Sequence, residues 1–113
     1  MSIPHAKSGE ILSLPLGKAL PTARTTTLVK TDELEVIRLV IPAGKEIASH
    51  QAPREITVQC LEGRVAVTAQ GQSQRLGAGQ FLYLAAEAAH SLKGIDDSSV
   101  LLTILLAGKD LTT

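Results

Sequence analysis

Three kinds of side chain in this sequence could carry chemistry: its histidines, its single cysteine and a glutamate near the middle of the chain. An unperturbed imidazole titrates near ~6.5 and can bind a metal or move a proton, so His50 and His90 are the first candidates for a site. His5 lies in a polar leader without periodicity, where we expect it to be exposed. Cys60 has no histidine close in sequence to act as its base, so we expect it to be a small buried hydrophobic residue.

The elements that must position these residues are short strands. Apolar runs alternate with turns that carry Gly, Pro or Asp, which is typical of an all-β fold. The pattern predicts strands at residues 11–16, 24–30, 33–41, 46–52, 55–61, 64–70, 73–76, 80–84, 88–93 and 98–107. Spacing of this kind fits a sandwich or a barrel, and the pattern alone does not separate the two.

The last predicted strand, at residues 98–107, differs from the others because seven of its ten residues are apolar and run almost without interruption. A strand of this composition is covered on both faces. We therefore expect either a central strand with a layer on each side, or a strand with one face against another subunit.

Composition limits the classes of function. The chain has 113 residues, which suits one domain, and its 11 basic residues balance 11 acidic ones. With Phe81 and Tyr83 as the only aromatic residues, the core must consist mainly of aliphatic side chains, and we expect no nucleic-acid binding. One cysteine indicates a reducing compartment, and no stretch approaches the ~20 apolar residues of a membrane span. No signal peptide is apparent, so we expect a soluble cytoplasmic protein that does not bind membranes.

Residues 44–63, GKEIASHQAPREITVQCLEG, resemble the first sequence motif of the cupin family. That motif sets a glycine, a His-x-His pair, a glutamate and a second glycine at fixed spacing. Gly44, His50 and Gly63 stand at the family positions. Ala52 takes the place of the second histidine, and Ile56 takes the place of the glutamate.

The second cupin motif is matched in spacing from Gly79 to Gly94. Its histidine is His90, whereas Ala85, Glu87 and Gly94 stand where the family has proline, glycine and asparagine. The chain is thus similar to a small, RmlC-like cupin of the cupin 2 type with a degenerate metal-ligand set. The resemblance implies an all-β double-stranded β-helix, a jelly-roll-like barrel of two antiparallel sheets. We expect a flexible leader at residues 1–10 and one cupin domain at residues 11–113.

The resemblance also implies where a divalent metal would bind, because cupins hold one with three histidines and a glutamate. Of these ligands only His50 and His90 remain. Two neutral imidazoles would leave the charge of the ion uncompensated in an apolar pocket, so we do not expect a dedicated metal centre. Glu55 lies one residue short of the glutamate position, and strand alternation turns it outward unless a β-bulge after Pro53 rotates it inward.

Three functions follow from these residues. The favoured one is binding of a small molecule in an apolar barrel pocket, with His50 and His90 facing each other across the cavity as polar anchors. The pocket residues we expect are His50, Ala52, Ile56, Val58, Leu82, Leu84 and His90. The second is a metal-dependent enzyme of the dioxygenase or isomerase type, with His50, His90 and an inward Glu55 as ligands. The third is a degenerate cupin kept for protein–protein contact.

Two further expectations concern partners. Arg54 and Arg64 flank the motif hairpin, where they form either a solvated edge or the mouth of a pocket for an acidic ligand. Residues 11–20 are apolar and would form an exposed edge, which proteins usually cover. We therefore expect a homodimer that uses this segment.

Overall fold

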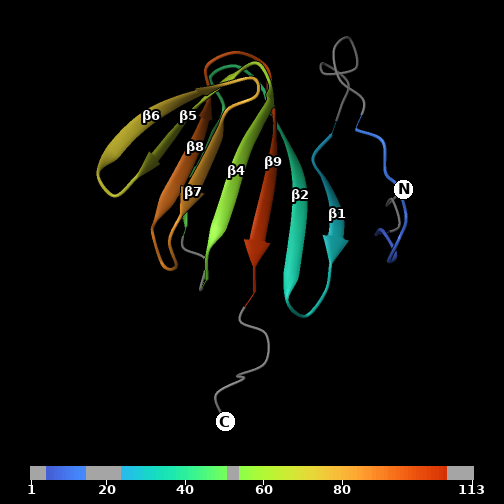
Figure 1. The fold of residues 1–113 in the computed structure, drawn as a ribbon. Coiled ribbons are helices and arrows are strands. Elements are labelled where there is room, and N and C mark those ends of the chain that lie inside the picture. The colour runs from blue at the N-terminus through green and yellow to red at the C-terminus, as the bar shows by residue number, and fades with distance from the viewer. Residues whose placement is uncertain (1–4, 15–23, 51–53, 107–113) are drawn as a thin grey trace.

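The computed structural model describes residues 5–14, 24–50 and 54–106. Within these residues nine strands form two antiparallel sheets (Figure 1). The strands are β1 (Thr26–Lys30), β2 (Leu34–Ile41), β3 (Glu46–His50), β4 (Ile56–Glu62), β5 (Arg64–Ala69), β6 (Gln72–Gly77), β7 (Phe81–Leu84), β8 (His90–Gly94) and β9 (Ser98–Leu105). In this part of the chain there is no helix long and apolar enough to cross a membrane.

The order of strands in the two sheets is set by long-range pairing. One sheet has five strands in the order β1-β2-β9-β4-β7, and the other has four in the order β3-β8-β5-β6. Neighbours far apart in sequence, such as β2 and β9, pair in regular antiparallel register. The all-β fold of two antiparallel sheets expected from the sequence is confirmed, and each predicted strand from residue 24 onward has a counterpart.

The core lies between the two sheets and follows strand alternation. In β4 the buried residues Ile56, Val58 and Cys60 alternate with partly exposed ones. In β9, Val100 and Leu102 point into the same core. The four-stranded sheet adds Val65, Val67, Leu76 and Leu92. The core is aliphatic as expected, because Phe81 and Tyr83 remain 61% and 53% exposed.

The N-terminal segment departs from its prediction. Residues 11–14 are not in a strand, and residues 15–16 lie outside the described part of the chain. The segment lies beside β1 (Figure 1), where the amide of Ala6 donates a hydrogen bond to the Leu28 carbonyl at 2.8 Å. Ile11 is 93% exposed. Leu12 and Leu14 are partly buried, so the alternation is kept without the regular pairing that would make residues 11–14 a strand.

Candidate functional site

The imidazole of His90 is buried at the start of β8. His90, Leu92 and Gly94 alternate inward along the strand, and His90 is 1% exposed. Its Nδ1 lies 3.2 Å from the carbonyl oxygen of Ala88. Because a carbonyl can only accept, Nδ1 carries the proton of this hydrogen bond. In the neutral ring Nε2, which is also buried, is therefore the nitrogen that can accept a proton or bind a ligand.

The backbone of His50 lies directly opposite His90 in the pairing of β3 with β8. The register changes between Ile47 and His50, so that three residues of β3 span the length of two in β8. Without this bulge Ser49 would be the partner of His90. The two histidine positions are therefore neighbours within one sheet, and the expectation that they face each other across the cavity is wrong. The side chain of His50 lies outside what the structure describes, as does Ala52.

The apolar residues expected to line the pocket occupy the inner face of the five-stranded sheet. Ile56 is the cross-strand partner of Leu84, and Val58 is the partner of Leu82. Ile56, Val58 and Leu84 are buried, and Leu82 packs against the same core. The structure thus brings these four residues together in two adjacent pairs.

Chain connections place the histidines and the first of these pairs at one end of the sandwich. Residues 51–55 join His50 to Ile56, and residues 85–89 join Leu84 to His90. Each connection is five residues long, so the strand ends that it joins must lie at the same end. The buried imidazole of His90 therefore lies at one end of the aliphatic core between the two sheets.

Glu55 is not part of this arrangement. Its carboxylate accepts a hydrogen bond of 2.5 Å from the hydroxyl of Tyr83, which is exposed on the outer face of the same sheet. This hydrogen bond, with smaller contributions from desolvation and the negative charge, raises the pKa of Tyr83 above its ordinary value. The structure therefore does not bring Glu55 together with His90. The irregularity that affects the site lies in β3, before His50.

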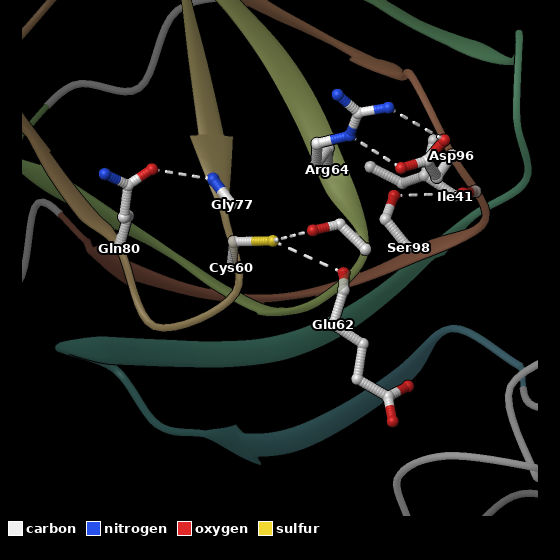
Figure 2. A network of polar contacts seen from close by, with 9 residues as sticks. Ile41, Cys60, Glu62, Arg64, Gly77, Gln80, Asp96 and Ser98 are labelled. Atoms are coloured by element: carbon white, nitrogen blue, oxygen red, sulfur yellow. Dashed lines mark hydrogen bonds and ion pairs between the residues drawn. The ribbon is translucent and has the colours of Figure 1, made fainter.

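Arg64 and Cys60 have structural partners at the other end of the molecule (Figure 2). The Arg64 guanidinium donates two hydrogen bonds to Asp96, at 2.7 and 3.3 Å, and these lower the pKa of Asp96. Arg64 begins β5, whereas Ala69 at the end of that strand is the partner of His90. Arg64 is thus about five residues, or ~17 Å, from the histidine end, so it does not line the mouth of a pocket there.

Cys60 belongs to the buried core, as expected. Its thiol lies 3.3 Å from the Glu62 carbonyl oxygen. Burial raises the pKa of this thiol.

Among the residues that the structure describes, no group of three His, Cys, Asp or Glu side chains could hold a metal ion. The family set of three histidines and a glutamate does not fit this chain, because Ala52 and Ile56 occupy two of the four positions. Any metal would need ligands from outside the motif.

Similarity to known proteins identifies the family of this chain. A family model described as a cupin domain matches residues 37–106, which is more than half of the chain. The chain belongs to the cupin family. No curated protein matches this cupin.

Many solved structures share the fold of this cupin, and the similarity of three of them is as follows. A conserved protein of unknown function from Streptococcus pyogenes is 20% identical, with 96% of this chain and 97% of that chain covered and a TM-score of 0.76. An RmlC-like cupin from Methanocaldococcus jannaschii is 16% identical, with 93% and 100% covered and a TM-score of 0.73. A salicylate 1,2-dioxygenase variant from Pseudoaminobacter salicylatoxidans is 18% identical, with 71% and 25% covered and a TM-score of 0.66. At these identities the likeness shows the fold alone.

Two of the three departures of this cupin from the second motif, Glu87 and Gly94, have visible backbone consequences. Glu87 stands at the family's glycine position and keeps a left-handed conformation, with φ of 65°. Gly94 stands at the asparagine position, and a Cβ there would lie 2.5 Å from the carbonyl oxygen of Pro42. The first departure keeps the turn of the motif, and the second permits close packing of β8 against the end of β2.

Sequence reasoning missed the buried Arg38 in β2. This residue is 5% exposed, and its Nε donates a hydrogen bond of 2.8 Å to the Ser99 hydroxyl of β9. The available signal was an arginine in the middle of the apolar run LEVIRLVI. A charged side chain at such a position usually has a partner, because burial without one is costly.

Proposed function

We propose that this cupin binds a small organic molecule at the histidine end of the sandwich, with His90 and His50 as its polar anchors. The observation that carries the proposal is the buried His90 ring, whose Nδ1 is held by the Ala88 carbonyl. With the proton on Nδ1, Nε2 is the ring nitrogen whose lone pair could accept a hydrogen bond from a ligand. The neighbouring Ile56 and Leu84 supply apolar surface for the body of the ligand.

The chemistry of His90 selects the kind of molecule. A neutral imidazole with its proton on Nδ1 accepts a hydrogen bond at Nε2, so it suits a hydroxyl or a protonated acid group. A protonated imidazole instead pairs with a carboxylate. The proposed ligand is therefore a small compound with an apolar body and one hydroxyl or carboxyl group, which is the usual balance in small-molecule pockets.

The test is a ligand screen followed by affinity measurement on variants. Saturation-transfer NMR with a mixture of short aliphatic and aromatic acids and alcohols would identify binders, and calorimetry would give their dissociation constants. His90→Ala and His50→Ala should weaken binding by about tenfold or more, because losing a hydrogen bond in a buried site costs about 1–3 kcal/mol. His5→Ala is the matched control, since His5 is exposed in the N-terminal segment.

Two results would contradict the proposal. One is equal affinity in the wild type and in both histidine variants. The other is loss of the β-sheet circular dichroism signal in the double variant at room temperature, which would make the histidines part of the structural core.

A second candidate is a metal-dependent enzyme of the dioxygenase or isomerase type. The observation in its favour is again the Nδ1 hydrogen bond of His90, because metal-binding histidines usually donate their other nitrogen to a carbonyl or carboxylate. Two histidines would need water or substrate to complete the shell. Adding Zn²⁺, Fe²⁺, Ni²⁺ or Mn²⁺ alone in the same calorimeter tests this candidate, which requires tight binding that His90→Ala removes.

A further inference from the structure

Glu87 has a backbone conformation that strand pairing does not explain. Among the described residues other than glycine, Glu87 and Gln70 are the two with positive φ, at 65° and 53°. Gln70 and Gly71 form the loop of the β5–β6 hairpin, where positive φ at both positions suits the twist of paired strands. Glu87 instead lies between β7 and β8, which belong to different sheets. Its conformation therefore has another cause.

That cause is a tight turn at residues 85–88. The Ala88 amide donates a hydrogen bond of 3.3 Å to the Ala85 carbonyl. Of the two central residues only Glu87 has positive φ, which is the pattern of a type II turn and favours glycine at this place. A residue with a Cβ keeps such a conformation only where its surroundings hold it, and residues of this kind are concentrated at functional sites.

The residue that the turn fixes is also the one that orients the ring of His90. The amide of Ala88 is held by the turn, its side chain packs against the core, and its carbonyl oxygen lies 3.2 Å from Nδ1 of His90. In a neutral imidazole one nitrogen donates and the other accepts, and the nitrogen that meets a carbonyl must donate. The direction of the Ala88 carbonyl therefore decides which nitrogen is the acceptor.

The backbone of Glu87, rather than its carboxylate, is the feature that makes this turn possible. The residue is exposed, whereas the ring of His90 is buried. Glycine adopts positive φ without strain. A β-branched residue at positive φ is strained far more than glutamate. Substitutions of these two kinds should therefore have opposite effects on the turn.

We propose that Glu87 is a positioning residue for the ligand site: its left-handed backbone directs the Ala88 carbonyl to Nδ1 of His90 and so makes Nε2 the acceptor. The proposal rests on the ligand-binding role proposed for His90. It adds a specificity to that role, because a ligand that donates a hydrogen bond is selected over one that can only accept. The selection depends on a turn whose central residue does not contact the ring.

The test is the tautomer of His90 in the protein without ligand. Nitrogen NMR of the imidazole rings at about pH 9, where an ordinary imidazole is neutral, distinguishes a protonated from an unprotonated ring nitrogen. The His90→Ala spectrum assigns the signals. The wild type should carry the proton on Nδ1, and Glu87→Val should lower the ratio of the Nδ1–H to the Nε2–H form by about tenfold, because the hydrogen bond to Ala88 is weakened.

Gln70→Val is the matched control. It introduces the same β-branched side chain at positive φ, and Gln70 follows Ala69, the cross-strand partner of His90, so both changes lie near the same end of β8. Gln70 is not part of the turn that fixes Ala88. Gln70→Val should therefore leave the tautomer ratio unchanged, although its cost in unfolding free energy should be similar to that of Glu87→Val.

Glu87→Gly separates the backbone from the side chain, and it should keep the wild-type tautomer. Circular dichroism would check the fold of each variant, and Glu87→Thr with Gln70→Thr replaces the valine pair if Glu87→Val does not fold. A wild type with the proton mainly on Nε2 would overturn the proposal. So would equal effects of the two valine variants, or loss of the Nδ1–H form in Glu87→Gly. These results are obtained without a ligand, so they are distinct from a failure of ligand binding in the calorimeter.

Discussion

Of the polar groups nearest the family's metal position, His90 and Glu55 lie on opposite sides of the sheets because side chains alternate along a strand. His90 points into the sandwich, where its ring is oriented by the Ala88 carbonyl. Glu55 lies on the outer face of the other sheet, hydrogen-bonded to Tyr83. A shift of one residue along a strand reverses the face of a side chain, so the replacement of the motif glutamate by Ile56 is not compensated by its neighbour.

The Glu55–Tyr83 contact can be measured directly, because Tyr83 is the only tyrosine and the chain has no tryptophan. We expect ultraviolet absorbance titration to give a tyrosinate pKa above the ordinary value, since the hydrogen bond to Glu55 favours the protonated phenol. Glu55→Ala should return this pKa toward its ordinary value. Glu46→Ala, an exposed change in β3, should leave it where it is in the wild type.

The same contact gives a pH dependence of stability with a defined sign. The folded-state pKa of Tyr83 is raised, so its contribution is present below the unfolded-state pKa and is lost as pH rises through the folded-state value. The difference in unfolding free energy between wild type and Glu55→Ala should therefore shrink in alkaline solution. A wild-type tyrosinate pKa equal to that of Glu55→Ala would show that Glu55 does not accept a hydrogen bond from Tyr83 in solution.

At the scale of elements, one glycine fixes the hairpin between β4 and β5. Gly63 has φ of 74°, and a Cβ there would lie 2.3 Å from the Asp97 carbonyl oxygen and 2.9 Å from Cα of Ser98. Both obstacles are backbone atoms that cannot rotate away. This close approach holds the hairpin against the start of β9.

Gly63→Ala should lower the free energy of unfolding by about 3 kcal/mol or more, because backbone must shift in addition to the strain of a positive φ. Gly71→Ala is the matched control. Gly71 has φ of 78° and open space around its Cα, so only the conformational strain of about 1 kcal/mol applies. Urea unfolding followed by circular dichroism gives both values, and equal losses would contradict the packing argument.

Most elements could be predicted from sequence because the signals are local. Alternation in β4 and β5 and the glycines at the turns identify strands directly. The bulge in β3 could not be predicted, because it depends on how β3 pairs with β8. The same limit applies to the candidate site: motif spacing identified His90, but whether His50 lies opposite it in the ladder is decided by that bulge.

At the scale of the whole molecule, the fold leaves the function open. The described residues form a cupin sandwich with one buried, oriented imidazole, and related folds belong both to a dioxygenase and to a protein of unknown function. Function therefore has to be argued from the site.

His90 is proposed to anchor an organic molecule rather than a resident metal. The most direct test of this proposal is native mass spectrometry with elemental analysis, on untagged protein purified without chelators. We predict an organic adduct on the wild type that is absent from His90→Ala and retained by His5→Ala, with divalent metal well below stoichiometry. Near-stoichiometric iron, zinc, nickel or manganese that His90→Ala removes would contradict the account and favour a metal-dependent enzyme.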